Sequence, residues 1–193
     1  MFMKVTVYGG ISTKGFSDKQ LQESNKLGRW LGERKIEVLT GACRGFPHTV
    51  GKEAAALGSK VVGFSPALNE KEHVEKYQFP LDGVTHMEYI QQDGTHKAEN
   101  FLRRSLDMNA FSDIVVALSG SWGTYIELLF SFFFKKTIIL IENFGGATEA
   151  FWGTYRYFDE RDNNLDVHHG ARIIRCKDVD EAIKTLDGFY KLK

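Results

Sequence analysis

The sequence predicts an α/β fold in which a doubly wound, mainly parallel sheet is the middle layer of a three-layer sandwich. Short β-rich runs alternate along the chain with stretches of helical periodicity, an order typical of parallel strands joined by crossover helices. The runs IVVAL (114–118) and TIILI (137–141) are apolar without alternation. Strands that are covered by helices on both faces have this pattern.

The β-rich runs predict six strands. They cover residues 4–8, 36–39, 60–64, 113–118, 137–141 and 172–175. The most apolar segment of the chain, residues 128–141, is interrupted by Lys135 and Lys136. Its two parts are therefore much shorter than the roughly 20 residues of a membrane span. We interpret it as a buried helix that leads into a buried strand, and we expect no membrane partner.

Helical periodicity predicts four main helices, over residues 17–34, about 49–57, 97–111 and 178–190. The first has one apolar face, and Ser17 and Asp18 can cap its start. The third has Leu102 and Leu106 among its apolar positions. The last has acidic residues at its start and lysines after its end, as the helix dipole favours.

The length of 193 residues fits a single domain over residues 1–193. Residues 66–86 and 143–170 are polar and irregular in pattern, so we expect them to be surface excursions rather than linkers. Lysine plus arginine and aspartate plus glutamate number 25 each. With no net charge to attract a polyanion, nucleic acid is an unlikely partner, although a local basic patch stays open.

The two cysteines, Cys43 and Cys176, are far apart and lack CxxC spacing. This usage, together with an N-terminus that does not resemble a signal peptide, leads us to expect a cytoplasmic protein. The adjacent His168 and His169 would point in opposite directions on an extended chain, so we expect no metal site. Cys43 could have a pKa lowered by a helix N-terminus, but a small residue lining a loop is the favoured interpretation.

Glycines follow three of the predicted strands, in YGGISTKG, TGACRG and SGSWGT. Glycine lets backbone N–H groups approach an anion, and the next helix adds its positive end. A tight turn explains each loop taken alone, and YGGISTKG is neither GxGxxG nor a P-loop, because Phe16 stands in place of the lysine. Together the loops predict a site for a nucleotide or another phosphorylated small molecule. The candidate residues are Gly9, Gly10, Gly41, Gly45, Gly120, Ser121, Gly123 and Thr124.

Glu127 follows the third of these loops. If a helix begins near Gly123, Thr124 and Glu127 lie one turn apart on the same face. A carboxylate there suits ribose hydroxyls or the positive charge on a sugar whose glycosidic bond is breaking. The alternative is a helix-dipole interaction worth about 0.3–1 kcal/mol. Because its neighbours are apolar, the carboxylate needs a partner, and periodicity does not choose between Arg103 and Arg104.

The segment RRSLDMNAFSDIVVALSGSWGTYIE (103–127) resembles the LONELY GUY group of Rossmann-like proteins, also labelled possible lysine decarboxylases. The pattern of that group is an arginine and a methionine four residues apart, an aspartate that opens a strand, and PGGxGTxxE. The residues in register are Arg104, Met108, Asp113, Gly120, Gly123, Thr124 and Glu127. With the earlier glycine loops, the resemblance covers most of residues 4–141.

The resemblance implies a Rossmann-like fold and a dimer or larger homo-oligomer. It implies an enzyme that hydrolyses the N-glycosidic bond of a nucleoside 5′-monophosphate, releasing the free base and ribose 5-phosphate. Arg104 and Glu127 match the catalytic residues of the group, and the loop 120–124 matches its phosphate cradle. No metal or organic cofactor is implied. Lysine decarboxylation is not expected, because nothing marks a lysine that would hold pyridoxal phosphate.

Two residues depart from the pattern of the group. Ser119 replaces its proline and Ser121 replaces its second glycine, with the bulky Trp122 beside them. These changes motivate an alternative, a protein of the same fold that binds or senses nucleotides without turnover. DprA-like DNA-processing proteins share the superfamily, and a DNA-binding role comes third because of the neutral charge balance.

The aromatic run at Phe130, Phe132, Phe133 and Phe134 is apolar nearly all round a helix. We expect it to be buried on more than one side. Packing in the core is the favoured interpretation, and a symmetric dimer interface is the other.

Overall fold

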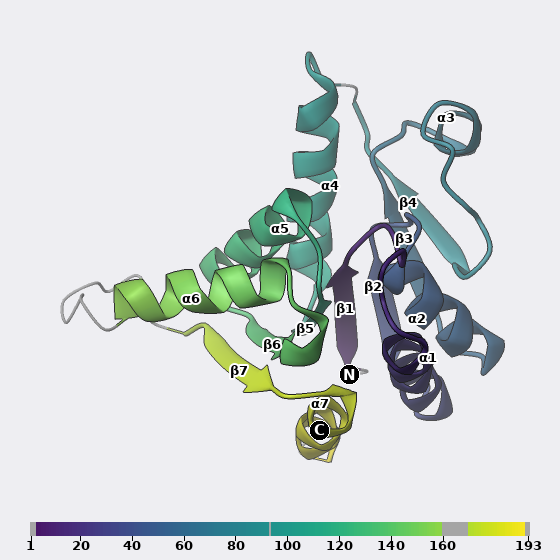
Figure 1. Ribbon diagram of the computed structural model, residues 1–193. Coiled ribbons are helices and arrows are strands. Elements are labelled where there is room, and N and C mark those ends of the chain that lie inside the picture. Colours follow the sequence, from purple (N-terminus) through teal and green to yellow (C-terminus); the bar gives the residue numbers. More distant parts are fainter. Residues whose placement is uncertain (1–2, 93, 160–169, 192–193) are drawn as a thin grey trace.

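The computed structural model describes residues 3–92, 94–159 and 170–191. Its centre is a seven-stranded sheet in the order β4-β3-β2-β1-β5-β6-β7, and every pair of neighbouring strands is parallel (Figure 1). The strands are β1 (Lys4–Gly9), β2 (Glu37–Thr40), β3 (Val61–Ser65), β4 (His86–Tyr89), β5 (Ile114–Leu118), β6 (Thr137–Ile141) and β7 (Arg172–Cys176). The predicted α/β fold is confirmed. All six predicted strands are present, with ends that differ by at most one residue.

Helices cover both faces of the sheet (Figure 1). One layer contains α1 (Asp18–Glu33), α2 (Phe46–Ala56) and α7 (Val179–Tyr190), and the other contains α4 (Lys97–Phe111), α5 (Trp122–Phe133) and α6 (Ala147–Asp159). Alternate residues of the central strands enter the two cores. Val116 belongs to the core under the first layer, for example, and Val115 and Ala117 belong to the second.

The predicted helix starts follow from local chemistry. Ser17 and Gln20 form a capping box at the start of α1, and Asp178 accepts a hydrogen bond from the Glu181 N–H at the start of α7. Helix α2 begins three residues before the predicted start, because Pro47 lies in its first turn with a favourable φ.

Two α-helices and one strand were not predicted, because they lie in the segments that we expected to be irregular. Helix α3 (Glu70–Glu75) and α6 are there, and β4 begins at the end of the first segment. Strand β4 lies at the edge of the sheet, and its side chains are alternately exposed and half-buried. It therefore has no apolar run that would mark it in the sequence. Its backbone hydrogen bonds come from pairing with β3. Residues 160–169 of the second segment, with His168 and His169, lie outside the described residues.

The prediction of core packing for the aromatic run is wrong for two of its residues. Phe133 is 64% exposed and Phe134 is 41% exposed, while Phe130 and Phe132 are half-buried. The predicted apolar positions Leu102 and Leu106 of α4 are also exposed. The buried face of α5 instead carries Thr124, Glu127, Leu128 and Ser131. Burial of these aromatic rings against a second copy of the chain stays a prediction.

No helix within the described ranges combines the length and the apolar character that crossing a membrane requires.

Candidate functional site

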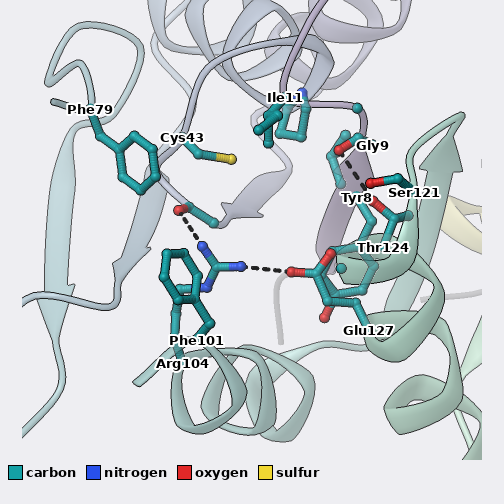
Figure 2. Close-up of a pocket in the computed structure, with 15 residues that line it drawn as sticks. Tyr8, Gly9, Ile11, Cys43, Phe79, Phe101, Arg104, Ser121, Thr124 and Glu127 are labelled. Carbon is teal, nitrogen blue, oxygen red and sulfur yellow. Dashed lines mark hydrogen bonds and ion pairs between the residues drawn. The ribbon is translucent and has the colours of Figure 1, made fainter. Parts of the chain in front are cut away.

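The order in which strands are added to the sheet reverses between β1 and β5, which are hydrogen-bonded neighbours. Strands β2 to β4 lie on one side of this point and β6 and β7 on the other. Ligands of open α/β sheets bind outside the carboxyl ends of the strands at such a switch point. A cavity of about 300 Å³ lies at this position (Figure 2). Its lining residues come from β1 and the loop after it, from the loop after β2, from the start of α2, from α4 and α5, and from the segment before β4. They are Val7, Tyr8, Gly9, Gly10, Ile11, Gly41, Cys43, Pro47, Phe79, Phe101, Arg104, Ser121, Gly123, Thr124 and Glu127.

Glycine is required where these loops meet. A Cβ on Gly9 would lie 2.6 Å from the Leu118 carbonyl oxygen, across the pairing of β1 with β5. A Cβ on Gly45 would lie 1.9 Å from the Gly10 carbonyl oxygen. Of the predicted phosphate-binding residues, Gly45 and Gly120 do not line the cavity. Gly45 brings the start of α2 against the first loop, whose Gly10 carbonyl accepts a hydrogen bond from the Phe46 N–H.

The first turn of α5 forms one wall of the cavity. Ser121 is the N-cap, and its side chain does not cap the helix. The backbone N–H groups of residues 121–124 have no acceptor among the described residues. A Cβ on Gly123 would meet nothing within 4 Å, so the space beside these donors is open. Free N–H groups and the positive helix end together favour an anion at this position.

Glu127 and Arg104 form a buried ion pair at the side of the same cavity (Figure 2). The Arg104 Nη2 donates to Glu127 Oε1 at 2.8 Å, and Ser105 Oγ donates to the same oxygen at 3.3 Å. The Arg104 Nη1 donates to the Gly41 carbonyl at 3.1 Å. Arg103 instead pairs with Glu99 near the surface. The structure therefore selects Arg104 as the partner of Glu127.

Burial governs the ionisation of this site. Burial raises the pKa of Glu127, and the positive charge of Arg104 and the hydrogen bonds of Ser105 and Arg104 oppose this rise. Burial also raises the pKa of the Cys43 thiol. Cys43 is a buried residue that lines the cavity, in agreement with the favoured interpretation, and the raised pKa does not support a thiol activated by a helix N-terminus. His48, the histidine nearest to Cys43 in the sequence, hydrogen-bonds to Asp82.

A buried polar network behind the ion pair was not predicted. Asn109 Nδ2 donates to Tyr8 Oη at 2.7 Å. Ser131 Oγ lies 2.7 Å from Asn109 Oδ1 and 2.8 Å from the Glu127 carbonyl oxygen. These bonds hold α4, α5 and β1 in a fixed relation. A signal was present in the sequence, because Ser105 and Asn109 are four residues apart and lie on the same face of the helix.

The wall opposite Glu127 is aromatic. Figure 2 shows Phe79 and Phe101 on one side of the cavity, with Thr124 and Glu127 on the other. Phe79 stacks on Tyr77, and Tyr77 contacts Phe101 edge to face. The sequence did not indicate Phe79, which lies in a segment expected to be a surface excursion.

A buried histidine anchors the segment that carries Phe79. His73 Nε2 donates to the Pro80 carbonyl oxygen at 3.2 Å, since that oxygen can only accept. His73 Nδ1 then accepts from Ser65 Oγ at 2.8 Å, at the end of β3. Burial lowers the pKa of His73, which favours the neutral ring that this pair of bonds requires.

The residues that depart from the LONELY GUY pattern shape the turn before α5. Ser119 has φ of 60°, and Gly120 has φ of 106°. A proline at position 119 could not adopt this conformation, because its ring holds φ near −65°. The Gly120 carbonyl accepts a hydrogen bond from the Ala147 N–H at the start of α6. The two serines therefore flank Gly120 in the turn between β5 and α5, and this turn is hydrogen-bonded to the start of α6.

No group of three His, Cys, Asp or Glu side chains that could hold a metal ion occurs in the part of the chain that the structure describes.

Solved structures with the same fold span almost the whole chain. The protein TM1055 superposes with a TM-score of 0.75 at 23% identity, over 97% of this chain and 99% of that one. A molybdenum cofactor binding protein from the phototrophic bacterium Rippkaea orientalis gives 0.67 at 16% identity, over 98% of each chain. DNA processing protein A from Helicobacter pylori, described with a single-stranded DNA binding mode, gives 0.67 at 16% identity, over 97% of this chain and 81% of that one.

These identities are low, so the likenesses show a shared fold. No curated protein matches the chain. The model of the SLOG cluster4 family matches residues 2–183, nearly the full length. The resemblance to the Rossmann-like superfamily that includes the LONELY GUY and DprA-like proteins is thereby confirmed. The chain belongs to the SLOG cluster4 family.

Proposed function

We propose that the protein hydrolyses the N-glycosidic bond of a nucleoside 5′-monophosphate. The observation that carries this proposal is the buried Arg104–Glu127 pair in the same cavity as the open N-terminus of α5. The 5′-phosphate would bind the free N–H groups of α5. The Thr124 hydroxyl, which donates to the Gly9 carbonyl oxygen at 3.3 Å, would give up that bond to donate to the phosphate. The ribose would lie against the ion pair, and the base against Phe79 and Phe101.

The ion pair supplies the chemistry. As the bond from C1′ to the base nitrogen breaks, positive charge develops on the ribose ring. Glu127 Oε1 accepts from Arg104 and Ser105, while Oε2 has no hydrogen bond to the described residues. Oε2 is thus the oxygen available to stabilise the sugar or to orient a water molecule. Water supplies the hydroxyl group to C1′ and a proton to the departing base, so ribose 5-phosphate and free base are formed.

Arg104 positions the carboxylate and favours its charged form. Two of its nitrogens donate, to Glu127 and to Gly41, and the Nε is buried without a partner among the described residues. A Cβ on Gly41 would lie 3.0 Å from Nη1, so the loop after β2 needs glycine at this point. The predicted loop TGACRG thus supports the ion pair as well as lining the cavity.

The alternative is a protein that binds or senses a nucleotide without turnover. The turn at Ser119 and Ser121, which differs from the LONELY GUY pattern, favours this alternative. Neighbours of the same fold are named for binding the molybdenum cofactor and single-stranded DNA. They support a ligand site on this fold without choosing the ligand. They do not support our expectation that nucleic acid is an unlikely partner.

One experiment separates the two functions. The protein is incubated with AMP, GMP, CMP and UMP, and chromatography detects free base and ribose 5-phosphate. We expect release from at least one nucleotide, and we expect Glu127→Gln to lose it by at least about a hundredfold, as catalytic carboxylates do. Glu99→Gln is the control, because Glu99 pairs with Arg103 at the surface. Calorimetric binding of a nucleotide without any release would establish the alternative.

A further inference from the structure

A second cavity of about 390 Å³ lies beside the first, between the starts of α5 and α6. Gly120, Ser121, Trp122 and Tyr125 line it from the α5 side. Residues 146, 147, 150 and 154 line it from the α6 side, and three of these four are glycine or alanine. Small residues leave room for a ligand between the two helices.

The two cavities meet at Ser121, which lines both. Gly123 and Thr124 face the first cavity, and Gly120 and Trp122 face the second. The free N–H groups of residues 121–124 therefore lie at the junction of the two cavities. An anion held there would have open space on both sides.

The second cavity has an aromatic wall that the fold leaves uncovered. Trp122 is 81% exposed, and its ring contacts Tyr125 edge to face at 6.2 Å between centroids. Tyr125 is itself held by its hydroxyl, which lies 2.8 Å from Thr154 Oγ1. A tryptophan exposed to this degree costs hydrophobic free energy unless something covers it. The flat face of an indole next to an anion site suits a heterocyclic base.

We propose that the second cavity binds a second nucleoside, so that the full ligand of this site is a dinucleotide. One nucleoside would occupy the first cavity, the linking phosphate would lie at the start of α5, and the second base would stack on Trp122. This inference rests on the proposed nucleotide site in the first cavity. The shared chemistry is two nucleosides joined through phosphate, whether by a pyrophosphate or by a phosphodiester.

Calorimetry with three probes tests the proposal: AMP, the pyrophosphate-linked NAD and the phosphodiester-linked pApA. One stacked base contributes enough for a gain of about tenfold in affinity. We expect at least one of the two dinucleotides to bind about tenfold more tightly than AMP, and the tighter one identifies the linkage. Equal affinities for AMP and both dinucleotides would overturn the proposal.

Filling the second cavity tests where the gain arises. Ala150 is exposed and lines only the second cavity, so Ala150→Phe should remove the tenfold gain and leave AMP affinity unchanged. Glu149→Phe adds the same ring at a neighbouring exposed position that does not line the cavity, and it should change neither affinity. If Ala150→Phe and Glu149→Phe behave alike, the second cavity is not the site.

Substitution of the tryptophan supplies a second line of evidence. Trp122→Ala should lose the dinucleotide gain, and Trp122→Phe should retain part of it, because a smaller ring still stacks. These measurements report binding, so they stand even if AMP is bound and never hydrolysed. In that case the enzyme proposal fails and the dinucleotide proposal is still decided. If both variants keep the full gain in dinucleotide affinity, stacking on Trp122 is contradicted.

Discussion

The two faces of helix α5 differ in a way that reverses the usual arrangement. The face toward the core buries Leu128 together with three polar residues, Thr124, Glu127 and Ser131. The outer face exposes Phe133, and Phe134 follows it at the end of the helix. A helix of a single-domain protein normally buries its apolar residues and exposes its polar ones.

The difference shows that one helix meets two separate requirements: it holds the polar residues of the cavity on one face and exposes aromatic rings on the other. Arg104 and Ser105 hydrogen-bond to Glu127, Asn109 bonds to Ser131, and the Gly9 carbonyl accepts from Thr124. These bonds offset the cost of burying the polar side chains. A carboxylate held in a buried network of this kind acquires a shifted pKa. Among the described residues nothing covers the exposed rings of Phe133 and Phe134, and we propose that a second copy of the chain does. The predictions below test the two faces separately.

The largest effect is expected from breaking the buried ion pair. Arg104→Ala leaves the Glu127 carboxylate buried without its cation, and loss of one partner of a buried pair costs about 3–5 kcal/mol. Chemical denaturation measures the change in the free energy of unfolding. Arg103→Ala is the matched control, since its pair with Glu99 is exposed and worth about 0.3–0.5 kcal/mol. Similar losses for the two variants would show that Arg104 and Glu127 are not a coupled buried pair.

The outer face should determine assembly. We expect a homodimer at micromolar concentration, and we expect Phe133→Ser combined with Phe134→Ser to weaken it by at least about two orders of magnitude. Burying each ring contributes about 1.5–3 kcal/mol, and both are lost. Sedimentation velocity measures the change in mass. Val74→Ser, at an exposed position of α3, should leave the mass unchanged. A monomeric native protein would contradict the inference.

The start of α5 should distinguish binding from folding. Gly123→Ala adds a methyl group into open space beside the free N–H groups, so we expect nucleotide affinity to fall by about tenfold through exclusion of the phosphate. The free energy of unfolding should be equal or higher by about 0.5–1 kcal/mol, since alanine favours a helix.

Gly153→Ala is the matched control for this substitution. Gly153 also has nothing within 4 Å of its built Cβ, but it lies in α6 and lines neither of the two cavities. It should gain similar helix stability and keep full nucleotide affinity. If Gly123→Ala binds nucleotide as tightly as Gly153→Ala, the phosphate does not lie at the start of α5.

The smallest effect concerns pH. Because burial raises the pKa of Glu127, hydrolysis that needs the carboxylate should fall, as pH decreases, at a pH above the ordinary range of a glutamate. The contribution of Glu127 to the free energy of unfolding changes in the opposite direction with pH. A raised folded-state pKa contributes stability that is present below the unfolded pKa and is lost as pH rises through the folded pKa. Glu127→Gln should remove this pH dependence of unfolding, and an unchanged dependence would assign it to other groups.

The strands and the glycine loops were predictable because their signals are local. Apolar runs predict buried strands, and capping residues such as Ser17 set helix starts. Strand β4 and helix α6, which the sequence did not predict, have weak local signals. Strand β4 exists because β3 offers it hydrogen bonds. Only Ala147, Thr148 and Phe151 are buried in α6, so its apolar face is short.

The candidate site was predictable in part for the same reason. Thr124 and Glu127 lie on one helix turn, so spacing alone places them together. Their partners are far away in the sequence. Phe79 reaches the cavity only because the segment before β4 folds back and is held by His73. The choice of Arg104 over Arg103 needed the packing angle of α4 against α5.

The sequence by itself thus determined the class of fold, the glycine loops that follow the strands, and the position of Glu127 one turn after Thr124. Each of these depends on residues that are close together in the chain. Only the tertiary structure decided which arginine is buried, which aromatic residues form the wall of the cavity and which lie in solvent. It also brought α6 beside the start of α5 and so created the second cavity. These outcomes depend on how elements pack across the sheet, and periodicity along one helix carries no information about its neighbours.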